Sequence, residues 1–113
     1  MKLVVVGTGR FKKRERLKTV LTNIHAGKEL KEIIIPMKPG AAAYAYDWAA
    51  EAEHVIPTTQ VPLKEQSARG EILRNLEIIK MNPDAILVAN TDFYIDHLID
   101  AAHKAKIQVL YVE

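Results

Sequence analysis

Blocks of apolar and polar residues alternate along this chain and predict strands and helices in strict alternation. Residues 3–6 are all apolar and mostly β-branched, which predicts a strand buried on both faces, as at the centre of a parallel sheet. An apolar stripe with helical spacing follows at Leu17, Val20, Leu21 and Ile24. It predicts a helix over residues 12–25, with Gly27 as its C-cap.

The same alternation continues to the end of the chain. Further strands are predicted at residues 32–36, 54–57, 84–89 and 107–112, with helices over 38–53, over 65–81 and after residue 92. Connections of this length suit crossover helices between parallel strands and not hairpins. We therefore expect an α/β fold: a single Rossmann-like three-layer domain over residues 1–113, with a five-stranded parallel sheet flanked by helices.

Local patterns add detail to the third strand and the helix after it. The strand at 54–57 is short, which indicates a sheet edge, and residues 58–60 are expected to form the turn that follows it. Ser67 is expected to cap the helix or to face solvent. The apolar positions Ile72, Leu73, Leu76 and Ile79, with the aliphatic stem of Lys80, trace this helix.

The last helix has a clear start and a clear apolar face. The segment 90–92 offers capping side chains directly before it. Its buried positions are predicted to be Ile95, Leu98, Ile99 and Ala102.

The segment 38–53 is rich in alanine and predicts a helix that packs closely. Tyr44 and Trp48 are four residues apart, and they share a face with Ala41, Ala45 and Ala52. That face packs either on the sheet or on a second subunit. We favour the domain interior, because large aromatic side chains on helices usually fill cores.

The composition limits which kinds of site this chain can form. The chain of 113 residues is long enough for one core, and it has no cysteine for a disulfide or a thiolate site. It shows neither a signal-peptide core nor a membrane span, so we expect a soluble, cytoplasmic protein. Sixteen basic and fourteen acidic residues give a net charge of +2. The basic run at 12–18 is most simply a solvated helix face, and no nucleic-acid partner is expected.

Ligands of such sheets bind beyond the carboxyl ends of the strands. The segments expected there are Gly7-Thr8-Gly9-Arg10-Phe11, Met37-Lys38-Pro39-Gly40, Thr58-Thr59-Gln60, Asn90-Thr91-Asp92-Phe93-Tyr94 and Glu113. Arg10 and Lys38 supply positive charge, while Phe11, Phe93 and Tyr94 supply rings. Because arginine matches phosphate oxygens and rings stack on bases, this set of side chains is typical of a nucleotide site.

Other motifs are incomplete. Lys12 stands where G-x-G-x-x-G requires its third glycine, and G-K-[ST] does not occur. The histidines are scattered, and Asp96, Asp100 and His103 are most simply a polar helix face, so neither a metal site nor a cofactor is expected. Several carboxylates could converge without their spacing requiring it, namely Asp47, Glu71, Asp92 and Asp96.

Short motifs spread over nearly the whole chain resemble those of one superfamily. They are Gly7 and Phe11 with Arg14-Glu15, Gly40-Ala41 with Trp48-Ala49, Arg74-Asn75, Pro83-Asp84, Ala101-Ala102 and Ile107-Gln108-Val109. In these motifs the chain resembles the SLOG superfamily, the Rossmann-like nucleotide-binding group that includes DprA/Smf and the LOG phosphoribohydrolases. The resemblance is greatest to the small stand-alone YspA-like branch.

Two loops depart from that family. Ala42 stands where the family's turn after strand two has an acidic residue, and the glycine-rich loop after strand four falls on residues 90–95, which contain no glycine. Leu98 stands where LOG enzymes have their catalytic glutamate. Both departures argue against hydrolysis, since a loop without glycine cannot offer the same close backbone approach to a phosphate.

Together, residues and resemblance predict a module that binds a nucleotide or nucleotide-derived signalling molecule, as a sensor or sequestering protein without catalytic residues. The expected ligand-binding residues are Gly7, Thr8, Gly9, Arg10, Phe11, Lys38, Gly40, Arg74, Asn75, Asn90 and Thr91. Two alternatives stay open: a nucleoside 5′-monophosphate phosphoribohydrolase-like enzyme that uses Asp92, Asp96 or Asp47, and a ligand-free oligomeric scaffold. The resemblance also implies a homo-oligomer formed through the Tyr44/Trp48 helix.

Overall fold

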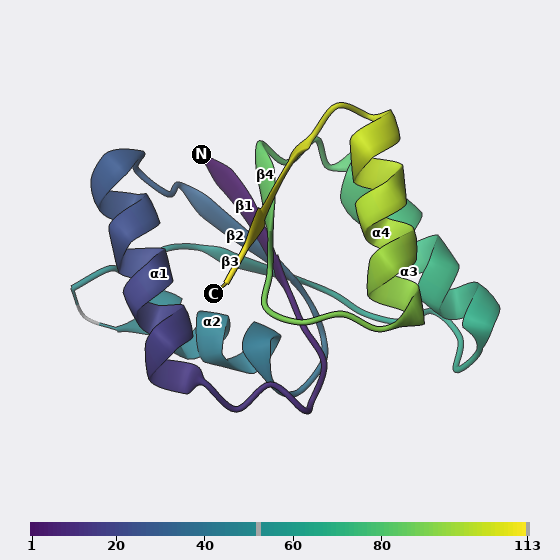
Figure 1. Cartoon of the computed structure of the whole chain (residues 1–113), viewed down its shortest axis with the longest axis horizontal. Coiled ribbons are helices and arrows are strands. Elements are labelled where there is room, and N and C mark those ends of the chain that lie inside the picture. The colour runs from purple at the N-terminus through teal and green to yellow at the C-terminus, as the bar shows by residue number, and fades with distance from the viewer. Residues whose placement is uncertain (52, 113) are drawn as a thin grey trace.

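The computed structural model describes residues 1–51 and 53–112, in which strands and helices alternate (Figure 1). In chain order the elements are β1 (Lys2–Val6), α1 (Arg14–Gly27), β2 (Glu32–Pro36), α2 (Ala41–Ala50), β3 (Thr58–Val61), α3 (Ala68–Lys80), β4 (Ala85–Val88), α4 (Phe93–Lys104) and β5 (Gln108–Tyr111). The α/β class and the five-stranded sheet predicted from the sequence are confirmed.

All neighbouring strands of the sheet are parallel, and their order is β3-β2-β1-β4-β5. β1 is the central strand, where Val4 pairs with Ile34 of β2 and with Ile86 of β4. Its four apolar residues are buried, as the uninterrupted run predicts for a strand covered on both faces.

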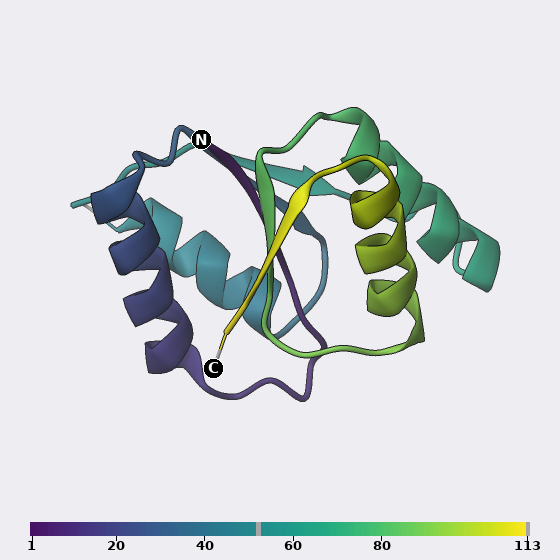
Figure 2. The ribbon, with the colours of Figure 1, turned by 45° about the horizontal axis from the view of Figure 1, so that its top comes forward.

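Side chains of β1 alternate between two cores, and two helices cover each of them. Leu3 and Val5 pack in the core beneath α1 and α2, whereas Val4 and Val6 pack in the core beneath α3 and α4. Figure 2 shows these helix pairs on opposite sides of the sheet. The result is the predicted three-layer, Rossmann-like arrangement.

The aromatic face of α2 packs mainly inside the domain. Trp48 is 1% exposed, and its indole Nε1 donates a hydrogen bond to Thr22 Oγ1 at 3.0 Å. Tyr44 is partly buried and lies against Phe11, with ring centroids 6.4 Å apart. The prediction that this face belongs to the core is confirmed for Trp48. Because its side chain is buried, Trp48 cannot contact a partner subunit. Ala52, predicted on the same face, lies outside the described residues.

The predicted position of the third strand is wrong, although its place at a sheet edge is confirmed. Residues 54–57 are not a strand, and the predicted turn at 58–60 forms the body of β3. Pairing begins where the Ile33 N–H donates to the Pro57 carbonyl at 2.9 Å. Val55 has φ of 48°, outside the extended region, so the apolar sequence at 54–57 does not continue the ladder.

The predicted helix α3 is confirmed, but its apolar positions coincide only in part with its buried face, to which Ile79 contributes. Leu73 and Leu76 are 39% and 41% exposed, while Ile78 is buried together with two polar residues, Arg74 and Asn75. Periodicity places apolar side chains on a common face but does not say which face meets the sheet.

The helix ends agree in part with the sequence. The Ser67 hydroxyl accepts from the Gly70 N–H, and the Asp92 carboxylate accepts from the Ile95 N–H, so both predicted caps are confirmed. The buried positions of α4 are those predicted. Gly27 is not the C-cap of α1, because Lys28 takes that place with extended backbone angles.

Among the described residues, the helices include none that is both long and apolar enough to cross a membrane.

Two truncations on α3 test which of its faces is buried. Ile78→Ala removes a fully buried side chain, so we expect the free energy of unfolding to fall by about 2–5 kcal/mol. Leu73→Ala trims a side chain that is partly in solvent and is expected to cost about 1 kcal/mol or less. Urea denaturation of both variants measures the difference, and an equal loss in the two would contradict this packing.

Candidate functional site

The carboxyl ends of β1 and β4 meet where the chain changes direction across the sheet. From β1 the chain adds β2 and β3 on one side, then crosses to add β4 and β5 on the other. Loops leaving such neighbouring strands diverge toward opposite faces and form the usual ligand crevice of this architecture. The candidate site is therefore centred on this crevice.

Thr8 and Asn90 join the two loops at this crevice by a reciprocal pair of hydrogen bonds. The Thr8 N–H donates to Asn90 Oδ1 at 2.8 Å, and Asn90 Nδ2 donates to Thr8 Oγ1 at 2.7 Å. The same hydroxyl also accepts from the Arg10 N–H at 3.1 Å. Thr8 and Asn90 thus hold the two loops together through hydrogen bonds within the protein itself.

The loop after β2 rests on the loop after β1 through Gly40. This residue has φ of +89°, and a Cβ atom placed on it would lie 2.3 Å from the Thr8 carbonyl oxygen and 3.2 Å from Gly9 Cα. Only glycine tolerates both the backbone angle and this contact. The two glycine-containing loops therefore converge, as the sequence predicts.

Beside the Thr8–Asn90 pair lies an open hollow of about 350 Å³ at the start of α1. We call it the basic hollow; it is lined by Arg10, Phe11, Lys12, Lys13, Asn90 and Val112, together with Ala89. Arg10, Lys12 and Lys13 are exposed, and within residues 1–51 and 53–112 no carboxylate forms an ion pair with them. Lys13 is the N-cap of α1 and gives it no side-chain cap, so positive charge and a helix N-terminus adjoin the same hollow.

A second, closed cavity lies on the α3–α4 side of the same edge. It holds only about 10 Å³ and contacts Gly7, Lys38, Glu71, Arg74 and Asn75. Arg74 Nη2 donates to Glu71 Oε2 at 2.7 Å, and Lys38 Nζ lies 3.5 Å from the same oxygen. Such a volume accommodates one water molecule at most, so a phosphate group does not fit there.

Arg74 is 3% exposed, and its Nε and Nη1 atoms have no hydrogen-bond partner among the described residues. Unsatisfied donors of this kind cost about 1–3 kcal/mol each, and more on a charged group. Asn75 has a structural role: its Nδ2 donates to the Tyr94 carbonyl at 2.8 Å and so ties α3 to α4.

The predicted ligand-binding residues therefore divide into two groups. Arg10, Phe11 and Asn90 line the basic hollow, whereas Gly7, Lys38, Arg74 and Asn75 line the closed cavity. Thr8, Gly9 and Gly40 form the loop contacts between them, and Thr91 is exposed.

The structure changes the assignment of Phe11, of the segment 58–60, and of Lys12 with Lys13. Phe11 is 7% exposed against Tyr44, so it offers no free face to a base. The segment 58–60 lies within β3 and not at its carboxyl end. Glu113 lies outside the described residues. Lys12 and Lys13 were assigned to a helix face, but they precede α1 and line the basic hollow.

The carboxylates considered for catalysis have other contacts. Asp92 caps α4, Glu71 pairs with Arg74, and Asp47 lies 3.6 Å from Arg14. The side chains of Asp96, Asp100 and His103 are exposed.

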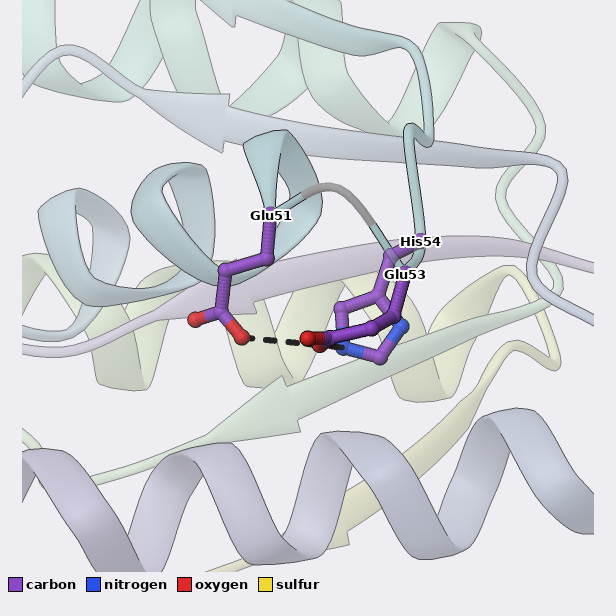
Figure 3. Close-up of side chains that lie close together, drawn as sticks. All are labelled: Glu51, Glu53 and His54. Carbon is purple, nitrogen blue, oxygen red and sulfur yellow. Dashed lines mark ion pairs between the residues drawn. The ribbon is translucent and has the colours of Figure 1, made fainter.

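In the described part of the chain, the one group of side chains close enough to share a metal ion is a different one: Glu51, Glu53 and His54 (Figure 3). The sequence E-x-E-H at the end of a helix was the signal that could have indicated it.

A glycine-to-alanine pair tests the contact between the two loops. Gly40→Ala introduces a Cβ at a positive φ, so we expect it to destabilise the fold by about 1–3 kcal/mol from backbone strain, with the clash against the Thr8 carbonyl adding to this. Gly9→Ala is the matched control, because its Cβ would lie 3.5 Å from Pro39 Cγ, an ordinary contact. Thermal unfolding of the two variants measures the effect. Equal stability of both would mean that the loops do not touch at Gly40.

No protein-family model matches this chain, and no curated protein matches its sequence. The resemblance to the SLOG superfamily therefore stays a prediction that depends on the short motifs quoted above.

Proposed function

We propose that this domain binds a nucleotide or a nucleotide-derived signalling molecule, with the phosphate in the basic hollow. The observation that carries the proposal is the gathering of Arg10, Lys12 and Lys13 around one hollow beside the crevice between β1 and β4. Three positive side chains with no ion-pair partner in the described residues favour an anion at this position.

The size of the basic hollow supports a small-molecule ligand. Its volume of about 350 Å³ lies at the lower end of the range of about 300–1,000 Å³ typical of ligand sites. Arginine can bind two phosphate oxygens at once, and lysine adds a mobile point charge, so Arg10 would fix the phosphate and Lys13 would neutralise it. Asn90 borders the hollow, although its amide already bonds Thr8.

No observation favours the hydrolase alternative over binding. Leu98, at the position of the catalytic glutamate in LOG enzymes, is 1% exposed in the core between the sheet and α4. One oxygen of Asp92 accepts the capping bond from the Ile95 N–H, so this carboxylate already has a structural role at the start of α4. We therefore propose binding without hydrolysis, in a cytoplasmic protein. A homo-oligomer would have to use a surface other than Trp48.

The proposal predicts an effect of two charges on affinity. Arg10→Ala combined with Lys13→Ala is expected to weaken nucleotide binding at least tenfold, because each charge-assisted hydrogen bond contributes about 1.5–3 kcal/mol. Isothermal titration calorimetry against a panel of mononucleotides, cyclic nucleotides and ADP-ribose measures it. Mass spectrometry of small molecules that co-purify with the wild-type protein selects the first compounds to titrate.

A matched control separates a specific site from a general effect of charge. Lys31→Ala combined with Lys104→Ala also removes two positive charges, but from exposed positions outside the basic hollow. This control is expected to bind like the wild-type protein. The absence of binding by the wild-type protein to every compound in the panel, or an equal loss in both double variants, would refute the proposed site.

A further inference from the structure

Glu51, Glu53 and His54 bring one nitrogen and two carboxylate ligands together where α2 ends. His54 Nε2 lies 3.8 Å from Glu51 Oε1 and 3.9 Å from Glu53 Oε2, and one ligand atom from each residue lies within 4.8 Å of the others. Figure 3 shows the three side chains pointing toward one another from the end of α2 and the segment before β3. We call this group the Glu–Glu–His cluster.

The spacing is close to that of a coordination shell. Zinc binds imidazole nitrogen and carboxylate oxygen at about 2.0–2.2 Å, which in a tetrahedron separates the ligand atoms by roughly 3.3–3.5 Å. The observed distances exceed this by about half an ångström for the two pairs that include His54. Side-chain rotation of Glu53, which is 79% exposed, can close its gap to His54. The gap between Glu51 and His54 requires a small rotation of the Glu51 side chain, which is 35% exposed.

Backbone and ring contacts hold the other two ligands in place. Glu51 is the C-cap of α2, and its carbonyl accepts from the N–H groups of both His54 and Val55. The His54 imidazole stacks on Trp48, with ring centroids 4.1 Å apart. The backbone of Glu51 and the imidazole of His54 are therefore positioned by the fold and not by the attraction between the side chains.

Lys18 binds the carboxylate oxygen of Glu51 that faces away from the histidine. Lys18 Nζ lies 2.8 Å from Glu51 Oε2, while Oε1 faces His54. This hydrogen bond lowers the pKa of the Glu51 carboxyl. A hydrogen bond to the outer oxygen of a carboxylate is the usual way in which proteins orient a metal ligand.

The surrounding charge favours a divalent cation. An open hollow of about 430 Å³ borders the cluster and is lined by three carboxylates, those of Glu15, Glu51 and Glu53, but by a single ammonium group, that of Lys18. The three carboxylates and the ammonium group together carry a net charge of about −2. A divalent metal ion balances this charge, and nitrogen together with oxygen donors suits zinc better than calcium or magnesium.

We propose that the Glu–Glu–His cluster binds a zinc-type divalent transition-metal ion. Glu51 Oε1, Glu53 Oε2 and His54 Nε2 supply the three protein ligands, and a fourth position faces the open hollow. The site would fasten the segment before β3 to the end of α2, and through Lys18 to α1. It is independent of the nucleotide proposal, since it shares no residue with the basic hollow.

The single tryptophan of the chain gives a direct test. Because Trp48 stacks on His54, Zn²⁺ added to the tag-free, metal-stripped protein is expected to change its fluorescence in a saturable way, with a stoichiometry of one by calorimetry. Glu53→Gln, at an exposed position that should not affect folding, is expected to weaken Zn²⁺ binding at least tenfold. His54→Gln is expected to weaken it further.

Two exposed residues away from the cluster provide the controls. His103→Gln and Glu29→Gln remove the same side-chain types at exposed positions and are expected to leave Zn²⁺ affinity unchanged. The proposal is overturned if the wild-type protein shows no stoichiometric Zn²⁺ binding. It is equally overturned if Glu53→Gln and His54→Gln bind Zn²⁺ as the wild type does, since the metal would then sit elsewhere.

Discussion

Burial of β1 on both faces and on both edges is the constraint on which the rest of this structure depends. Its side chains enter two separate cores, so helices must cover both sides of the sheet. Its edges pair with β2 and β4, so the loops that follow these three strands end close together. Thr8 meets Asn90, although 82 residues separate them, because their strands are neighbours. The position of the candidate site follows from where this one strand lies.

At the carboxyl ends of the strands, polar groups of the loops form hydrogen bonds with one another and with α4. Thr8 and Asn90 bond each other, Gly40 packs on the Thr8 carbonyl, and Asn75 bonds the backbone of α4. Among the described residues of this edge, the cations that precede α1 remain exposed and without an ion-pair partner. Arg74 differs from these because it is charged, deeply buried and only partly hydrogen-bonded in the described structure. Such a group is costly to keep, which is characteristic of residues retained for a reason other than stability.

The layer formed by α1 and α2 carries two surfaces of opposite charge. At the start of α1, Lys13 contributes to the basic hollow, and about one turn later Lys18 holds the outer oxygen of Glu51 in the acidic cluster. The N-cap and the second turn of α1 therefore contribute to different surfaces, because Lys13 and Lys18 face different neighbours. Two ion pairs link α1 to the α2 region, since Arg14 lies 3.6 Å from Asp47 and Lys18 lies 2.8 Å from Glu51.

The sequence by itself determined the element order, the parallel sheet and the burial of β1 and α4, because uninterrupted apolar runs and helical periodicity are local properties of the chain. It did not determine the start of β3, which depends on where Pro57 can accept from Ile33. Nor did it determine the buried face of α3, where Leu73 lies outside and Arg74 inside. Only the tertiary structure divided the predicted site between a basic hollow and a closed cavity, and only it brought His54 onto Trp48 beside two carboxylates. Contacts of this kind depend on how elements pack across the sheet, and spacing along the chain does not encode them.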